Sequence, residues 1–555
     1  MYERRRGNIN DTTRGVAALS LMQSWPLTVD KMLTHAGRWH AATEVVARDG
    51  AGLISRSGYG AIERRAHQLS SAFAAAGIVE GDRIATLAMN SIPHFEAWFG
   101  ISAMGAVCHT LNPRLFNDQL VYIINHATDR WILADAIFLP ILERVLPSCP
   151  SVERVVVIGA PVTSSVAGRP AIGYEELIAG MPADSRWGDF DENAPAGLCY
   201  TSGTTGHPKG VLYTHRSQVL HTLFAITAEN LGITARDTVL MVVPMFHANA
   251  WGVPFATATV GTKLVLPGPK LDGESIYGLL ESEAVTLTCA VPTVWMQLLE
   301  YMRARDLKLS TLKRVLIGGS ACPETLMRAF DAYGVEVIHA WGMTETSPIG
   351  TAAAPTAAIA KLPENERMAQ RLKQGRVGLS VDMKITDEEG NALAHDGKQQ
   401  GHIKVKGPCV IARYYPGDEP PVLDAQGYFD TGDIGCIDRH GYLQITDRSK
   451  DLIKSGGEWI SSVEIECIAA GHPKALMAAV IAIPHPKWRE RPLLIVKLKP
   501  EVSATPAEFL GFLKGKIASW WMPDDVVFID EMPLGGTGKL DKKRLRALYS
   551  AAPTR

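Results

Sequence analysis

The sequence predicts an α/β protein with a large N-terminal part, a small β-rich subdomain and a small α+β C-terminal part. Three observations lead to this prediction. Short β-rich runs alternate with longer helical patterns in the first part of the chain. Short strands and turns begin near Val377, and residues 453–555 again combine strand and helix patterns. Alternating strands and helices are typical of parallel sheets covered by helices. The 555 residues also exceed what one hydrophobic core usually contains, which indicates more than one domain.

The expected strands of the large part are short apolar runs that recur along the chain. They comprise residues 83–89, 152–158, 262–266, 284–290 and 314–319, with a helix between Phe95 and Met104. The last run ends in Gly318 and Gly319, and a helix then opens at Pro323 and Glu324. Because ligands of open α/β sheets bind at the carboxyl ends of strands, this glycine pair marks a candidate site.

The remaining elements are shorter strands and a final mixed unit. Strands are expected within residues 381–390, 402–407 and 441–447. The charged tract 447–451 precedes a glycine pair and a helix from about Ser462, so this tract is a candidate interdomain hinge. The C-terminal unit ends in L-G-G-T-G-K-L-D-K-K-R-L, and residues 1–24 are expected to form a flexible extension.

Composition narrows the class of partner. The formal net charge of -2 indicates no global attraction to nucleic acid or to an anionic membrane, so small molecules are the expected partners. The eight cysteines include no C-x-x-C pair, which disfavours a zinc site and a disulfide framework. No apolar run approaches the length of about 18 residues that a membrane-spanning helix needs, so a cytoplasmic enzyme is expected.

The stretch Tyr200–Gly210, Y-T-S-G-T-T-G-H-P-K-G, is the strongest single motif. Glycines let backbone N–H groups approach an anion closely, and the hydroxyls and the lysine add donors and positive charge. A nucleoside triphosphate suits such a loop. It is not a Walker A loop, because Pro208 stands where the second glycine belongs and Gly210 where Ser or Thr belongs. A glycine-rich surface turn is the alternative interpretation.

Four further motifs accompany it: His339–Ser347, Phe429–Asp433, Asp447–Ile460 and Pro533–Lys539. In the first, an aromatic residue beside a glycine offers a flat wall for a base, while a hydroxyl and the Glu345 carboxylate suit phosphate and Mg²⁺. In the second, the Asp433 carboxylate suits two ribose hydroxyls. Taken alone, Glu345 also fits a solvated helix residue and Asp433 an Asx-turn.

With all five motifs in order, residues 25–548 resemble the adenylate-forming superfamily of acyl-CoA synthetases, firefly luciferase and peptide-synthetase adenylation domains. V-P-M-F-H-A-N-A-W-G-V-P-F, D-L-I-K-S-G-G-E-W-I-S-S and I-P-H-P-K-W-R-E-R-P most resemble bacterial medium- and long-chain fatty acyl-CoA synthetases. Methylmercaptopropionate- and arylalkanoate-CoA ligases are similar too. The resemblance implies an AMP-binding domain over residues 25–447, a hinge over 448–452 and a mobile C-terminal domain over 453–555.

The resemblance implies an ATP-dependent acid-CoA ligase of fatty acid and lipid metabolism. The carboxylate of a medium- or long-chain fatty acid, or of an aryl-alkanoic or thioether acid, attacks the α-phosphate of ATP, and the CoA thiol then displaces AMP from the acyl-adenylate. ATP, Mg²⁺ and coenzyme A are the implied cofactors and co-substrates. An adenylation enzyme that loads a carrier protein, a luciferase-like oxygenase and a non-enzymatic ATP-binding regulator are the alternatives. The long-chain relatives also suggest a homodimer.

The resemblance further implies roles for individual residues. The expected catalytic residues are Lys539, which bridges the substrate carboxylate and the α-phosphate, and Thr201 and Glu345 near Mg²⁺. The expected nucleotide-binding residues are Thr201, Ser202, Gly203, Thr204, Thr205, Gly206, Lys209, Gly319, His339, Ala340, Trp341, Thr344, Asp433, Arg448 and Lys450. The expected acyl and CoA side consists of His247, Trp251, Lys454, Gly456, Gly457 and Trp459.

Two features of these roles stay open. Trp251 fits either a gate of the acyl tunnel or a buried structural tryptophan. Rotation about Lys450 is expected to withdraw Lys539 after adenylation and to bring residues 454–459 toward the adenylate.

The chain departs from the common family pattern at three places. Trp341 stands where most relatives have Tyr, Ala340 where Gly is common, and Phe429-Asp430 where an aromatic residue and Arg are usual. The departures at Trp341 and Ala340 leave an aromatic wall in place and bear on the shape of the purine or acyl pocket. The third removes an arginine and leaves Asp433 in place.

Overall fold

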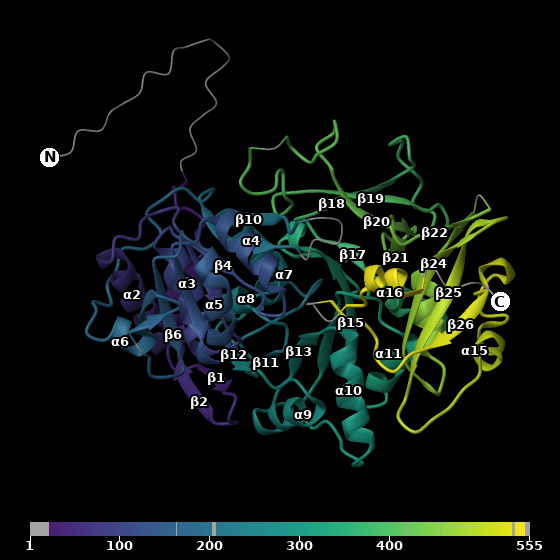
Figure 1. The fold of residues 1–555 in the computed structure, drawn as a ribbon, viewed down its shortest axis with the longest axis horizontal. Coiled ribbons are helices and arrows are strands. Elements are labelled where there is room, and N and C mark those ends of the chain that lie inside the picture. The colour runs from purple at the N-terminus through teal and green to yellow at the C-terminus, as the bar shows by residue number, and fades with distance from the viewer. Residues whose placement is uncertain are drawn as a thin grey trace, which may run out of the picture.

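The computed structural model describes residues 22–162, 164–201, 207–418, 420–456, 458–535 and 539–549. Six residues of the predicted site, Ser202, Gly203, Thr204, Thr205, Gly206 and Gly457, lie outside the described residues, as do most of the predicted extension 1–24. The described chain contains four β-sheets, two large and two small, and the C-terminal unit lies at the opposite end of the molecule from the N-terminal helices (Figure 1).

The first large sheet has nine strands and is parallel in its centre. Its spatial order is β17 (Arg376–Val377), β16 (Ile349–Ala352), β15 (Glu336–Gly342), β14 (Arg314–Ile317), β13 (Leu287–Ala290), β11 (Thr238–Met241), β12 (Lys263–Leu266), β1 (Glu44–Arg48) and β2 (Ile54–Gly58). The strands from β15 to β1 pair in parallel, and antiparallel strands close both edges. The strand runs expected within 262–266, 284–290 and 314–319 all belong to this sheet.

The second large sheet has eight strands. Its order is β10 (Gly210–Thr214), β9 (Pro195–Tyr200), β4 (Val107–Thr110), β3 (Arg83–Leu87), β5 (Trp131–Asp135), β6 (Arg154–Ile158), β8 (Arg169–Gly173) and β7 (Ser165–Val166). It too is parallel except for the strand at each edge. The antiparallel β9–β10 hairpin carries the predicted phosphate motif at its turn.

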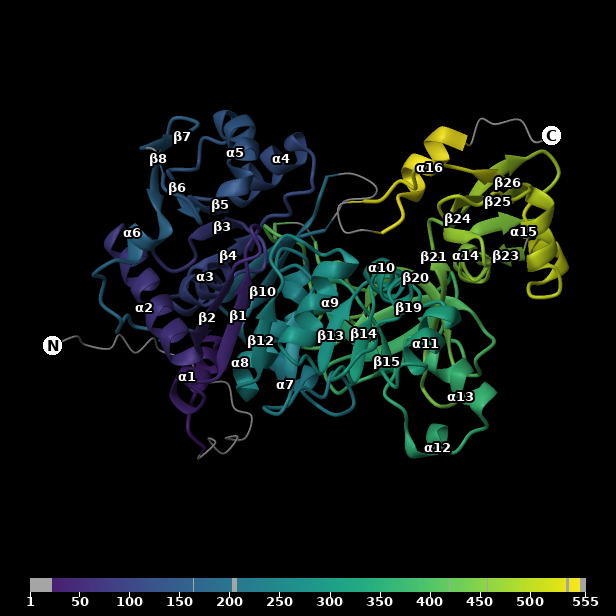
Figure 2. The same ribbon diagram turned by 90° about the horizontal axis from the view of Figure 1, so that it is seen from below.

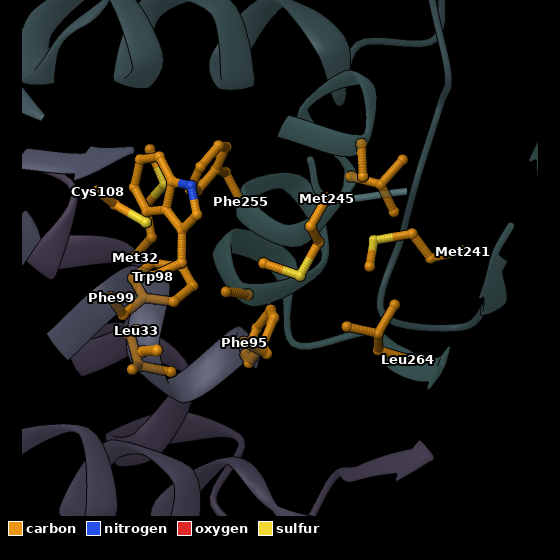
Figure 3. Packing of buried hydrophobic residues seen from close by; sticks show 14 of the residues in the cluster. Met32, Leu33, Phe95, Trp98, Phe99, Cys108, Met241, Met245, Phe255 and Leu264 are labelled. Carbon is orange, nitrogen blue, oxygen red and sulfur yellow. The ribbon is translucent and has the colours of Figure 1, made fainter. Parts of the chain in front are cut away.

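Helices fill the space between the two large sheets and cover their outer faces. The inner core contains residues of α1 (Asp30–Trp39), α2 (Tyr59–Ala75), α3 (Ile92–Ala103), α7 (His215–Ala225) and α8 (Val253–Val260), together with strands of both sheets. Figure 3 shows Trp98 and Phe99 of α3 beside Phe255 of α8 and Leu33 of α1. The largely apolar α3 is buried along its whole length, which explains why it sits in the middle layer.

The outer helices pack on the opposite faces. The nine-stranded sheet is covered by α9 (Gly273–Ser282), α10 (Pro292–Arg303) and α11 (Glu324–Asp331), and the eight-stranded sheet by α4 (Asn117–Ala127) and α5 (Leu139–Val145). Shorter helices are α6 (Tyr174–Ile178), α12 (Ala357–Ala360) and α13 (Glu364–Arg371). No helix within the described ranges is long and apolar enough to cross a bilayer.

The two smaller sheets form the rest of the molecule. An antiparallel sheet contains β18 (Asp382–Thr386), β19 (Gly401–Lys406), β20 (Phe429–Ile437) and β21 (Leu443–Arg448). The last sheet contains β23 (Glu458–Ile460), β22 (Ile453–Ser455), β25 (Arg489–Leu498), β24 (Ala475–His485) and β26 (Asp525–Phe528), and it packs with α14 (Ser462–Ala470), α15 (Pro506–Leu513) and α16 (Lys542–Tyr549). Its two apolar clusters, as far as the chain is described, draw only on residues from Ile453 onward. Figure 2 shows this C-terminal unit at one end of the molecule.

Candidate active site

A cleft of about 1600 Å³ lies where the nine-stranded sheet, the small β-subdomain and the C-terminal unit meet. Its lining includes thirteen of the residues predicted from sequence: Thr201, Lys209, His247, Trp251, Gly319, Ala340, Trp341, Thr344, Glu345, Asp433, Arg448, Lys450 and Lys539. They come from segments more than 300 residues apart in the chain. The cleft lies at the carboxyl ends of β14 and β15, where open α/β sheets bind their ligands.

The ends of the glycine-rich loop are held together by the β9–β10 hairpin. The Thr201 N–H donates to the Lys209 carbonyl at 2.9 Å, and the Lys209 N–H donates to Thr201 Oγ1 at 3.3 Å. The Lys209 ammonium lies 4.7 Å from the centre of the Tyr414 ring, a cation–π distance. The hairpin therefore places one hydroxyl and one cation at the edge of the cleft.

Glu345 belongs to the short helical turn Thr344–Thr346 that follows β15. Its side chain is buried, and burial raises the pKa of the carboxyl group. The Tyr414 hydroxyl donates to Glu345 Oε1 at 2.9 Å, and the Tyr213 hydroxyl donates to the Thr344 carbonyl at 2.9 Å. Two tyrosines from distant segments thus orient this turn.

Tyr414 was not among the residues predicted from sequence. It contacts both Lys209 and Glu345, so it connects the hairpin to the acidic turn. The R-Y-Y-P run at residues 413–416 is the only signal in the sequence, and nothing in that run shows which tyrosine faces the site.

Asp433 lies on β20 opposite Arg448 at the end of β21. Arg448 Nε lies 2.9 Å from Oδ1, and Trp341 Nε1 donates to Oδ2 at 2.8 Å. The carboxylate is buried between these two donors. Asp430, which replaces the usual arginine, accepts the Gly432 N–H at 2.9 Å and so shapes the turn before Asp433.

Trp341 is itself largely buried. Its indole packs with Met383 and Phe429 in the core of the small β-subdomain while one edge lines the cleft. The ring stands on Gly350, where an added Cβ would lie 2.6 Å from Cζ3. The predicted flat wall is thus anchored by packing on one side and by the bond to Asp433 on the other.

Lys539 reaches the cleft from the C-terminal unit. A Cβ added to Gly319, whose φ is +80°, would lie 3.5 Å from Lys539 Cε, which is van der Waals contact, so the lysine lies directly beside this glycine. Burial lowers the pKa of Lys539 to about 8, and Arg448 adds to the lowering, whereas Asp433 and Glu345 oppose it. The ammonium group therefore sits among the same side chains that surround the predicted nucleotide.

The segment that carries Lys539 is anchored by charges that sequence reasoning missed. Lys542 lies 2.7 Å from Glu466 and donates to Ser462 Oγ at 2.6 Å, and Arg546 lies 2.8 Å from Asp451. These contacts join α16 to α14 and to the predicted hinge. The signal in the sequence was the basic run K-K-R-L-R after Lys539, which equally fits a solvated helix face.

Contacts across the predicted hinge tie α14 to β21. The Ser462 N–H donates to Asp447 Oδ2 at 2.6 Å, and the Ser461 hydroxyl donates to the Thr446 carbonyl. Asp447 is buried, and burial raises the pKa of its carboxyl group. The C-terminal unit is therefore held in one orientation by polar contacts close to the hinge.

The segment around His247 and Trp251 has an unusual backbone. Residues Ala248, Asn249, Ala250 and Trp251 have φ values between 43° and 58°, a left-handed turn that L-residues rarely adopt. It places the Trp251 ring against Gly318, where an added Cβ would lie 3.3 Å from the ring. Burial lowers the pKa of His247 to about 3, and Lys539 and Arg114 add to the lowering, so this histidine is neutral. Trp251 is both buried and part of the cleft lining.

Four predicted site residues lie elsewhere. His339 is buried behind the cleft, its Nδ1–H donates to the Leu372 carbonyl at 2.9 Å, and burial lowers its pKa to about 4. Lys454 and Trp459 pair across β22 and β23, and the Gly456 N–H donates to the Trp488 carbonyl at 2.9 Å. None of these four is among the described residues that line the cleft.

The donors in the cleft suit a hard cation held jointly with phosphates. Within the described ranges, no group of three or more His, Cys, Asp or Glu side chains could enclose a metal ion. Thr201 and Glu345 offer a hydroxyl and a carboxylate at the same cleft. Mg²⁺ is commonly bound by one or two carboxylates together with substrate phosphates and water, which fits this donor set.

Comparison with known proteins gives matches over nearly the whole chain. The profile of the AMP-binding enzyme family matches residues 34–415, and that of the AMP-binding enzyme C-terminal domain matches residues 464–539. A 3-methylmercaptopropionyl-CoA ligase of Ruegeria lacuscaerulensis is 46% identical over 97% of this chain and 100% of the relative. A medium-chain-fatty-acid–CoA ligase of Ectopseudomonas oleovorans is 47% identical over 96% of this chain and 97% of the relative.

Solved structures agree in fold. An anthranilate CoA ligase in complex with anthranoyl-AMP superimposes with a TM-score of 0.85 at 23% identity and covers 94% of this chain and 98% of its own. ATP-bound MatB from Rhodopseudomonas palustris gives a TM-score of 0.79 at 24% identity, with 94% and 99% covered. The predicted α/β architecture is confirmed by these similarities.

Proposed function

This chain belongs to the AMP-binding enzyme family, and from that premise we propose that it joins a carboxylic acid to coenzyme A through an acyl-adenylate. ATP supplies the leaving group, and AMP and pyrophosphate are released. The observation that carries the proposal is the position of Lys539 beside Gly319 in the same cleft as Glu345 and Asp433.

The chemistry requires charge neutralisation more than covalent participation. The acid's carboxylate attacks the α-phosphate, the bond to pyrophosphate breaks, and the acyl-adenylate then carries AMP as its leaving group. The thiol of coenzyme A attacks the acyl carbon, its proton leaves, and AMP departs. Because both reactants of the first step are anions, a cation placed between them lowers the barrier. Several basic residues of the C-terminal unit line the cleft. Lys542 and Arg546 are paired with Glu466 and Asp451, whereas Lys539 lies beside Gly319, so Lys539 takes this role.

The nucleotide is held by the remaining residues of the cleft. Asp433 accepts hydrogen bonds from the ribose, and Arg448 keeps its carboxylate oriented. The loop between Thr201 and Lys209 binds the β- and γ-phosphates. Thr201 and Glu345 would hold Mg²⁺, which when bound would neutralise phosphate charge.

The second step uses a different orientation of the C-terminal domain. Rotation over residues 448–452, around Lys450, withdraws Lys539 and brings the 454–459 segment to the adenylate. Two findings support a boundary there. The described apolar clusters of the C-terminal unit contain no residue before Ile453, and Gly456, Lys454 and Trp459 do not line the present cleft.

The acid occupies the side of the cleft formed by His247 and Trp251. A neutral His247 beside an apolar ring suits an uncharged acyl chain. The relatives named above are ligases of a thioether acid and of medium-chain fatty acids, which supports acids of these classes. A cytoplasmic location accords with eight unpaired cysteines, because disulfides are rare in that compartment. The homodimer stays a prediction.

Pyrophosphate release tests this function directly. The purified chain is assayed with ATP and Mg²⁺ against straight-chain, thioether and aryl-alkanoic acids, each with and without coenzyme A. Multiple turnovers that require coenzyme A and yield acyl-CoA are expected. A single equivalent that coenzyme A cannot turn over would indicate a carrier-protein acceptor instead, oxygen consumption would indicate the oxygenase, and no release with any acid would contradict the proposal.

A further inference from the structure

We propose that Trp341 is a positioning residue that makes the site selective for ribonucleotides, because it fixes the Asp433 carboxylate so that each oxygen keeps one acceptor for one ribose hydroxyl. This inference rests on the proposed function, since it takes the nucleotide to be ATP. Trp341 acts through Asp433 and needs no contact of its own with the ribose.

The Asp433 carboxylate has hydrogen-bonding capacity left after its contacts within the protein. A carboxylate accepts about four hydrogen bonds, two at each oxygen. Arg448 Nε takes one position at Oδ1 at 2.9 Å, and Trp341 Nε1 takes one at Oδ2 at 2.8 Å. The Asp433 N–H is directed elsewhere, to Thr431 Oγ1 at 3.1 Å. Each oxygen is thus left with one acceptor position, and the two hydroxyls of a ribose supply two donors.

The donor to Oδ2, the Trp341 indole, is held rigidly by packing. The Trp341 side chain is 7% exposed and packs in the core of the small β-subdomain, while its backbone belongs to β15 of the large sheet. Its ring rests on Gly350, where any side chain would collide with it. The indole therefore cannot follow Asp433 if the carboxylate rotates, so the bond at Oδ2 sets the plane of the carboxylate.

The hydrogen bond from Trp341 restrains the Asp433 carboxylate in a way that Arg448 alone does not. The Arg448 side chain is 45% exposed, so packing restrains it less than it restrains the buried Trp341 ring. Removing the indole N–H leaves the carboxylate anchored at one oxygen only. Phenylalanine and tyrosine keep an aromatic ring at this position, but neither has an N–H where the indole nitrogen lies.

The test compares nucleotides in one variant. Trp341→Phe is assayed for pyrophosphate release with ATP, 2′-deoxyATP and 3′-deoxyATP, and for binding of AMP and 2′-deoxyAMP by calorimetry. We expect the preference for the ribonucleotide to fall by about tenfold, because hydrogen bonds to a charged group contribute at this scale. The effect should appear in KM and in the AMP dissociation constant more than in kcat.

Trp295→Phe is the matched control. Trp295 is another buried tryptophan, it does not line the cleft, and its Nε1 has no hydrogen-bond partner among the described residues. This variant should lose packing and keep the nucleotide preference. If Trp341→Phe weakens ATP and 2′-deoxyATP equally, the residue is merely structural and the inference is overturned.

Two further variants make the result of the nucleotide comparison interpretable. Trp341→Met serves if the phenylalanine variant does not fold, because methionine fills space and has no hydrogen-bond donor. In the background of Asp433→Ala, Trp341→Phe should have no additional effect on the nucleotide preference, whereas an undiminished effect there would overturn the role through Asp433. Failure of the wild type to release pyrophosphate would refute the proposed function, while the AMP calorimetry would still test the role of Trp341.

Discussion

At the residue scale, burial changes the pKa of Lys539, the cation of the proposed mechanism. Ordinary lysine has a pKa near 10.5, and burial beside Arg448 lowers that of Lys539 to about 8. The proposed role requires the ammonium form. Its population therefore falls as the pH rises through about 8, well below the range in which an exposed lysine titrates.

We therefore expect the rate of adenylate formation to decline above about pH 8. Lys539→Arg should remove this decline, because arginine stays protonated, although its different shape will lower the rate. Lys539→Ala should slow adenylation on the order of 100-fold or more and largely spare thioester formation from supplied acyl-AMP. Single-turnover assays of the two half-reactions measure both effects. Equal losses in both half-reactions would be incompatible with the role given to Lys539.

Tyr414 is the second residue that can be tested by itself, because its hydrogen bond can be removed while its ring is kept. Tyr414→Phe removes the hydrogen bond to Glu345 but keeps the ring beneath Lys209. We expect the Mg²⁺ concentration for half-maximal rate to rise about tenfold, because Glu345 loses its orienting donor. Tyr415→Phe is the control, since the hydrogen bond of that hydroxyl within the described part of the chain is a 3.4 Å contact with the Ala127 carbonyl. An unchanged Mg²⁺ dependence in Tyr414→Phe would argue against Glu345 as a metal ligand.

At the element scale, the start of α14 performs two tasks at once. Ser461 caps the helix by accepting the Glu464 N–H at 3.0 Å, and its hydroxyl also donates to Thr446 on β21. Most helix caps act within one domain. This one links the C-terminal unit to the small β-subdomain, so the stability of the helix and the docking of the domain are coupled.

Ser461→Ala should therefore have a larger effect than the loss of an ordinary cap. A cap typically contributes about 1 kcal/mol, which is also the expected cost of Thr505→Ala at the start of α15. Both variants should exchange amide hydrogens faster in their own helix. Only Ser461→Ala should also slow adenylation relative to thioester formation, because Lys539 loses its docked position. The same half-reaction ratio in both variants would show that the contact to Thr446 does not hold the domain.

At the scale of the whole molecule, one cleft serves two reactions that need different surfaces. The C-terminal unit presents Lys539 to the cleft, while residues 454–456 are not among the described residues that line it. The polar contacts at Asp447 and Ser461 hold this arrangement with few groups, which suits the rotation proposed above.

Gly456→Ala tests the rotated state. Gly456 has φ +60°, and an added Cβ would lie 2.8 Å from the Trp488 ring, so alanine must displace the segment. Thioester formation should fall on the order of 10-fold to 100-fold, while adenylation is retained. Gly515→Ala is the control, because it has φ +77° but nothing within 4 Å of the added Cβ. Equal acyl-CoA formation by both variants would remove this segment from the thiol path.

The sequence by itself determined the α/β class, the strand runs and the five motifs, because these depend on local periodicity and on residue types at fixed spacings. The runs ending at Gly319 and beginning near Ser462 lie where they were expected. Only the tertiary structure decided which side chains meet. The bond from Trp341 to Asp433 spans 92 positions and that from Tyr414 to Glu345 spans 69. Such contacts follow from the packing of separate sheets and from the docking of the C-terminal unit, and no local pattern encodes the direction in which a buried side chain finally points.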